Sequence, residues 1–194
     1  MTKTLPELLS EVRACTVCGA SLPRGPRPVV QIGPRAKILV IGQAPSTRVH
    51  ETGVPWNDRS GARLREWMGV DAATFYDPDR VATMAMGFCY PGVAKGGGDN
   101  PPRRECAPLW HERLRSHLVD VRLTLLVASY AQKAYLQRGA KQSLAEAVRN
   151  FEPDLMPLPH PSWRCAGWMR RHPWFEAEVL PALRQRVAAA LGEA

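Results

Sequence analysis

The 194-residue sequence contains no hydrophobic run long enough to span a membrane. Its first residues, MTKTLPELLSEVRAC, include acidic side chains and lack the apolar centre of a signal peptide. The sequence also shows no internal repeat, low-complexity segment or linker. We therefore expect one domain over residues 1–194, located in the cytoplasm and without a membrane partner.

The most apolar short stretch, residues 37–42, ends in GQAPS without any of the usual signs of a reactive site. No Gly-rich phosphate cradle, nucleophile or carboxylate follows it, so a phosphate-binding loop of the common kind is excluded there. Hydrophobic residues make up 45% of the chain and charged residues 23%, which is typical of a globular protein. The net charge of +8 fits either an ordinary soluble surface or a polyanion partner.

Strands alternate with helices along the chain. Apolar runs predict strands at 37–42, 81–88, 122–129 and 154–158, and apolar periodicity predicts helices at 5–13, 60–70, 107–118, 130–139 and 175–191. Ser60 is the expected cap of the second helix, and Pro181 is expected to break or kink the last one. Residues 15–34, 43–59 and 89–106 are expected to form loops. This alternation predicts an α/β fold, a three-layer α/β/α sandwich around a central, mostly parallel four-stranded sheet.

Ligands bind outside the carboxyl ends of the strands in such sheets. The segments GQAPS, CYPG, SYAQ and PHPS all fall at these ends. Their convergence is the first indication of a functional site.

The five cysteines allow several interpretations. Cys15 and Cys18 form a CxxC pair, whereas Cys89 ends a strand and Cys106 opens a helix. A disulfide framework or a thioredoxin-like pair fits this arrangement poorly. An iron–sulfur cluster, a zinc site and unliganded core thiols all remain open on spacing alone. Cys165 lies in another predicted loop and is expected to be a free thiol.

Five segments occur in a characteristic order: CTVC, GQAPS, GVPWNDRSG, FCYPGVAKGGGDNPPRRECAP and PHPSWR. In this order they resemble the iron–sulfur branch of the uracil-DNA glycosylase superfamily, as a divergent subgroup. The resemblance implies a [4Fe–4S] cluster held by Cys15, Cys18, Cys89 and Cys106, with zinc as the alternative. It also implies DNA as the partner, single- or double-stranded, and a monomeric protein.

The resemblance further assigns roles to individual residues. His160 would stabilise the departing base, and Trp56 would stack on a flipped base. The base pocket would comprise Gly42, Gln43, Ala44, Trp56 and Ala85. A loop of Pro161, Ser162, Trp163 and Arg164 would enter the duplex. Candidate phosphate contacts are Arg48, Lys95, Arg103 and Arg104.

Two positions depart from the family pattern. The first motif carries Gln43 and Ala44 where relatives place a carboxylate, so Gln43 would orient a water instead, or His50 or Glu51 would replace the missing base. Ala85 stands where the uracil-reading asparagine is expected, and alanine has no polar side-chain group.

These observations lead to a monofunctional DNA glycosylase for uracil or another deaminated or damaged base, without a lyase step. The alternatives are an inactive nucleic-acid-binding protein on the same scaffold and a zinc protein of unrelated chemistry.

Overall fold

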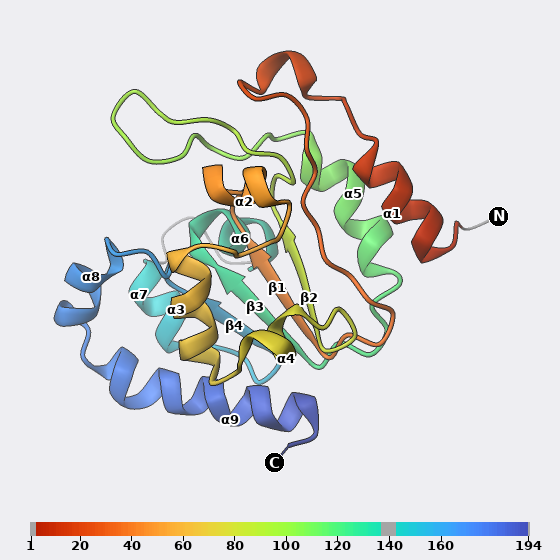
Figure 1. Ribbon diagram of the computed structural model, residues 1–194. Coiled ribbons are helices and arrows are strands. Elements are labelled where there is room, and N and C mark those ends of the chain that lie inside the picture. The colour runs from red at the N-terminus through yellow and green to blue at the C-terminus, as the bar shows by residue number, and fades with distance from the viewer. Residues whose placement is uncertain (1–2, 137–142, 194) are drawn as a thin grey trace.

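A four-stranded, all-parallel sheet forms the centre of the fold (Figure 1). The computed structural model describes residues 3–136 and 143–193. The strand order is β2-β1-β3-β4. The strands are β1 (Ile38–Gly42), β2 (Val81–Ala85), β3 (Leu123–Val127) and β4 (Leu155–Leu158). The predicted α/β sandwich with a parallel sheet is therefore confirmed.

Alternate residues of β1 pack into two different cores. Ile38 and Val40 belong to one core and Leu39 and Ile41 to the other, because successive side chains of a strand point to opposite faces. Every residue of β1 is buried, as expected for an inner strand of a parallel sheet covered on both sides. The sheet is thus the middle of three layers.

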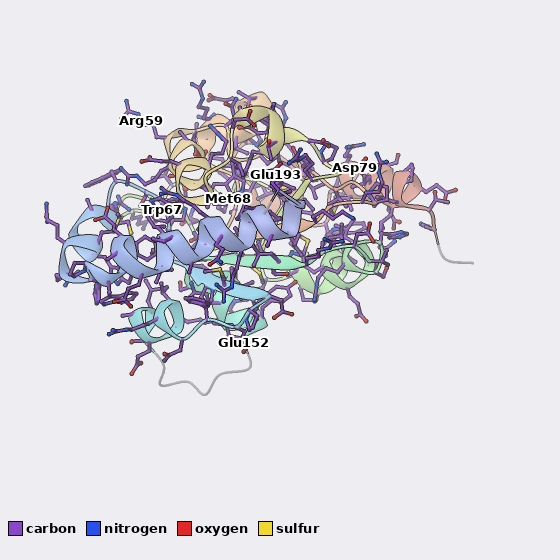
Figure 2. All side chains as sticks on the ribbon, turned by 90° about the horizontal axis from the view of Figure 1, so that it is seen from below. Arg59, Trp67, Met68, Asp79, Glu152 and Glu193 are labelled. Carbon is purple, nitrogen blue, oxygen red and sulfur yellow. The ribbon has the colours of Figure 1, made fainter. Side chains whose placement is uncertain are left out.

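Helices cover both faces of the sheet. They are α1 (Leu5–Arg13), α2 (Thr47–Thr52), α3 (Arg59–Met68), α4 (Ala72–Tyr76), α5 (Cys106–Arg115), α6 (Ala128–Tyr135), α7 (Leu144–Arg149), α8 (Cys165–Arg171) and α9 (Leu180–Leu191). Helix α9 packs on α3 and on the sheet, and α1 packs on α5 at the opposite face (Figure 1). Trp67 and Met68 lie between α3 and α9, whereas Arg59 projects from the outer end of α3 (Figure 2).

Several predicted boundaries were wrong. Helix α3 begins at Arg59, and its cap is Asp58, whose carboxylate accepts from Gly61 N; Ser60 is already inside the helix. Helix α2 occupies part of the predicted loop 43–59. Cys165 begins helix α8 rather than lying in a loop. Strand β2 ends at Ala85, three residues early, because the chain then turns toward the end of β1, with Met86 N donating to Gly42 O.

The last predicted helix is built in two parts. A π-helical turn, Phe175–Val179, leads directly into α9, and Pro181 stands in the first turn of α9. A proline is tolerated there because the first turn needs no backbone donor. Phe175, Val179, Leu183 and Val187 are buried as the spacing of four predicted.

Helix α6 starts two residues before the predicted 130–139, and positions 137–139 of that prediction lie outside the described residues. The predicted loop 89–106 contains one isolated antiparallel bridge, between Val93 and Asp99. Within the described part of the chain, no helix is both long and apolar enough to cross a membrane.

Candidate active site

A cavity of ≈ 540 Å³ opens at the carboxyl edge of the sheet. Gly42, Gln43 and Ala44 line it at the end of β1, and Ala85 lines it at the end of β2. A Cβ atom added to Gly42 would lie 2.8 Å from a ring carbon of Trp56. The glycine therefore allows the Trp56 ring to lie directly against the end of the strand.

Trp56 is held by its backbone as well as by its ring. Its φ of 57° is in the left-handed region, which is uncommon for a bulky residue and often marks a functional position. Its carbonyl oxygen accepts from Tyr76 Oη at 3.3 Å and from Arg65 Nη1 at 3.4 Å. The ring centroid lies 6.3 Å from that of His160. The tryptophan and the histidine thus line the same cavity from different segments.

His160 follows β4, and its imidazole makes no hydrogen bond with the residues that the structure describes. Burial lowers the pKa of His160 below its ordinary value of 6.5, and the nearby Asp58 carboxylate opposes that shift. The backbone carbonyl of His160 accepts from Ser162 N at 2.8 Å, which closes a tight turn. The neutral form of the imidazole is therefore favoured at pH 7, and the ring lines the cavity without a hydrogen-bond partner among the described residues.

The loop after His160 presents an aromatic ring and a cation. Trp163 is 76% exposed, and the Arg164 guanidinium lies 5.4 Å from the centre of its ring. Arg63 Nη1 donates to Ser162 O at 2.8 Å and so ties the loop to α3. Ser162, Trp163 and Arg164 line the cavity, whereas Pro161 is buried beside it and does not.

Sequence reasoning missed the carboxylate of Asp58, which lines the cavity. Its Oδ1 accepts from Gly61 N at 2.9 Å, and its Oδ2 accepts from Ser46 Oγ at 2.6 Å. The sequence did contain a signal for it: Asp58 stands three residues before Gly61, a spacing typical of an aspartate that caps a helix. Asp58 therefore joins the GQAPS turn to α3 and places a negative charge near His160.

The two alternative bases considered from the sequence do not line the cavity. His50 is buried on α2 with its ring 5.9 Å from Tyr90, and Glu51 pairs with Arg24 at 2.7 Å. A second carboxylate, Asp99, does line the cavity. It lies in the glycine-rich segment that is closed by the bridge between Val93 and Asp99. Burial raises the pKa of Asp99, the Asp58 carboxylate adds to that shift, and Arg164 opposes it.

Cys15, Cys18, Cys89 and Cys106 line one common pocket, although they come from three separate segments. Burial raises the pKa of Cys89 to about 11 and that of Cys106 to about 12, and the neighbouring cysteines add to both shifts. Phe88 N donates to Cys106 Sγ at 3.3 Å. Cys165 lies elsewhere, buried in the core beneath α9. Among the described residues, no group of three or more His, Cys, Asp or Glu side chains is arranged to hold a metal ion.

The basic candidates differ in their surroundings. Arg48 and Arg59 border a surface hollow that adjoins the cavity through Asp58, and Arg48 Nε donates to Asn57 O at 2.8 Å. Arg103 pairs with Glu105 at 2.7 Å. Lys95 and Arg104 are exposed.

Comparison with protein-family models matches residues 30–184 to the family described as the Uracil DNA glycosylase superfamily. The match covers more than half of the chain and includes all four strands and His160; Cys15 and Cys18 precede it. The cavity at the carboxyl edge of the sheet lies almost entirely within the matched residues. The chain therefore belongs to the uracil-DNA glycosylase superfamily.

Proposed function

We propose that the protein is a monofunctional DNA glycosylase that hydrolyses the N-glycosidic bond of uracil or another deaminated or damaged base. One observation carries this proposal: an imidazole without a hydrogen-bond partner among the described residues, an aromatic ring and a carboxylate line the same cavity. A base inside a duplex can reach such a cavity only when its nucleotide is flipped out of the stack. The Trp56 ring offers a flat surface against which that base would stack.

His160 would stabilise the departing base. When the glycosidic bond breaks, its electron pair goes to the base, which becomes negatively charged. A neutral imidazole can donate one N–H to a base oxygen, and in a buried site such a bond is stronger than in water. Because burial favours the neutral form of His160, one ring nitrogen carries the N–H that donates and the other has no proton.

Asp58 would orient the attacking water. Ser46 and Gly61 each occupy one of its carboxylate oxygens, but each oxygen can accept a second hydrogen bond. The water oxygen forms a bond to the sugar C1′ and passes its proton to the carboxylate. Gln43, which also lines the cavity, can hold the same water through its amide group. A carboxylate outside the GQAPS turn thus takes the place of the one that the turn lacks.

No lysine is among the described residues that line the cavity, so we propose no Schiff base and no lyase step. The exposed Trp163 ring, backed by Arg164, would enter the duplex where the nucleotide has left. Arg48 and Arg59, beside the cavity, would contact phosphates of the same strand.

We also propose that the four-cysteine pocket holds a [4Fe–4S] cluster, with zinc as the alternative. The proposal is supported by the convergence of four cysteines from three separate segments on one pocket, since a cluster needs four thiolates that meet in space. The Phe88 N–H donated to Cys106 Sγ is a further favourable feature, since amide donors stabilise ligating thiolates. The cluster would be structural and would take no part in bond cleavage.

The excision test uses purified, cluster-loaded protein and oligonucleotides that carry uracil, hypoxanthine or xanthine, each as single strand and as duplex. We expect an abasic product from at least one of them. If no substrate yields a product, the protein is not a glycosylase for these bases. Tight binding to the same oligonucleotides without product, unchanged in His160→Ala, would instead support the inactive nucleic-acid-binding protein.

A further inference from the structure

Thr83, which lines the cavity, carries a buried hydroxyl group with no hydrogen-bond partner among the described residues. In the described part of the chain, four buried side-chain nitrogen or oxygen atoms lack a hydrogen bond: His50 Nδ1, Arg80 Nε, Thr83 Oγ1 and Arg103 Nε. Of these four residues, only Thr83 lines the cavity. Thr83 is 1% exposed. An unpaired buried hydroxyl is unfavourable, so its persistence at a binding site calls for an explanation.

Several backbone groups near this hydroxyl already have hydrogen-bond partners. The Ala85 carbonyl lies 2.9 Å from His111 Nε2, and Met86 N donates to Gly42 O at 2.9 Å. Gly87 N donates to Gln43 O at 3.1 Å. The Thr83 backbone itself exchanges both of its hydrogen bonds with Gln31. These backbone groups already have partners, whereas the Thr83 hydroxyl beside them has none among the described residues.

Thr83 and Ala85 are two residues apart on β2 and therefore point to the same face of the sheet. Thr83 is further from the carboxyl end of the strand, so it lies deeper than Ala85. A flipped base is attached to its sugar at the mouth of the cavity, so the edge opposite the glycosidic nitrogen reaches deepest. In uracil that edge carries the C4 carbonyl and the adjacent N3–H.

We propose that the Thr83 hydroxyl binds the C4-carbonyl edge of the flipped base, as the specificity-determining group that Ala85 cannot provide. This inference rests on the proposed glycosylase function. A hydroxyl can donate to the carbonyl oxygen or accept from the ring N–H. It rotates freely about its C–O bond, so the same residue serves any base with a carbonyl beside a ring N–H. A base that enters the cavity would supply the partner that this hydroxyl lacks among the described residues.

The test separates binding from catalysis. The probes are oligonucleotides with one 2′-fluoroarabino nucleotide, which resists hydrolysis, bearing either uracil or pyrimidin-2-one, which lacks the C4 carbonyl. We expect the wild-type protein to bind the uracil probe about tenfold more tightly than the pyrimidin-2-one probe. Thr83→Val, which replaces the hydroxyl with a methyl group of similar size, should bind both probes equally. Thr83→Ser should retain the preference.

A stability measurement excludes a purely structural role. Thr83→Val should melt at or above the wild-type temperature, because it removes an unpaired buried hydroxyl. Thr124→Val, on β3 and away from the cavity, is the matched control and should bind both probes as the wild type does.

Three results would overturn the inference: a wild-type protein that does not distinguish the probes, a Thr83→Val variant that still does, or a lower melting temperature with normal binding. Failure of the proposed function would look different. It would leave every excision substrate intact, while the binding probes still report the Thr83 contact.

Discussion

At the scale of single residues, the polar groups of the cavity combine structural and chemical tasks. Asp58 caps α3, holds the Ser46 hydroxyl and places a negative charge close to His160. The His160 imidazole, in contrast, makes no hydrogen bond among the described residues, and it lies beside the Trp56 ring. Replacing Asp58 would thus disturb structure and activity together, whereas replacing His160 isolates the chemistry.

We expect His160→Ala to lower the single-turnover excision rate by about 10²–10³-fold, the usual effect of removing one donor to a developing negative charge. His117→Ala, two residues beyond the end of α5 and outside the cavity, is the control and should keep the wild-type rate. Equal rates in His160→Ala and the wild type would contradict the assigned role.

The same histidine predicts a pH dependence of stability. Its pKa is lowered in the folded protein, so just below pH 6.5 the unfolded chain binds a proton that the folded protein does not. The free energy of unfolding therefore falls as pH drops through 6.5, by at most about 1.4 kcal/mol per pH unit for this group. Melting curves between pH 8 and pH 5 should show a shallower decline for His160→Ala than for the wild type.

The sequence identified His160 and Trp56 because both stand in recognisable motifs. It did not identify Thr83, which looks like any β-branched residue of an apolar strand. Whether a strand hydroxyl is paired depends on neighbours distant in sequence, here the Gln31 backbone and the end of β1. The local sequence pattern therefore cannot show whether the Thr83 hydroxyl has a hydrogen-bond partner.

At the scale of elements, the strands were predicted to within about three residues because their apolar runs are strong signals. The six-residue helix α2 was not, since it is too short to show periodicity and owes its ends to Ser46, which accepts from Val49 N, and to Gly53 in the left-handed region. Helix α8, with seven residues, is nearly as short. Short helices of this kind depend on caps and tertiary contacts more than on their own sequence.

Helix α3 approaches the Trp56 segment through Gly61. A Cβ atom added there would lie 1.7 Å from the Trp56 carbonyl oxygen, so that any side chain must displace the cavity wall. Gly61→Ala should lower the free energy of unfolding by about 1–3 kcal/mol, although alanine favours helix formation. Chemical denaturation measures this change.

Gly167→Ala in α8 is the matched control, because the added methyl group meets nothing closer than 4.0 Å. It should stabilise the protein by about 0.5–1 kcal/mol through helix propensity alone. A Gly61→Ala protein as stable as Gly167→Ala would show that the Trp56 segment moves away without cost.

At the scale of the whole molecule, the four-cysteine pocket joins segments that are far apart in the sequence. Residues 15–34, here called the arm, carry Cys15 and Cys18 and run beside β2. Val29 N donates to Phe88 O at 2.8 Å, and Gln31 pairs with Thr83. The arm thus covers the edge of the sheet and contributes Val29 to the lining of the cavity at its carboxyl edge. A cluster in the pocket would fasten this arm to the start of α5.

If the pocket holds the proposed cluster, removing one ligand should release the arm as well as the metal. We expect Cys106→Ala, purified without oxygen, to lose its iron and visible absorbance, and to melt at least about 5 °C lower than the wild type. Limited proteolysis should cut it within residues 15–34.

Cys165→Ala also removes a buried thiol, but one in the opposite core, so it should retain its iron and its resistance to proteolysis. Full iron content in Cys106→Ala would disprove the ligand assignment, and wild-type protein containing zinc without iron would favour the zinc site. Because the arm contributes Val29 to the cavity and Gln31 to the backbone of Thr83, a loss of base binding in Cys106→Ala would follow from the freed arm rather than from any chemistry of the cluster.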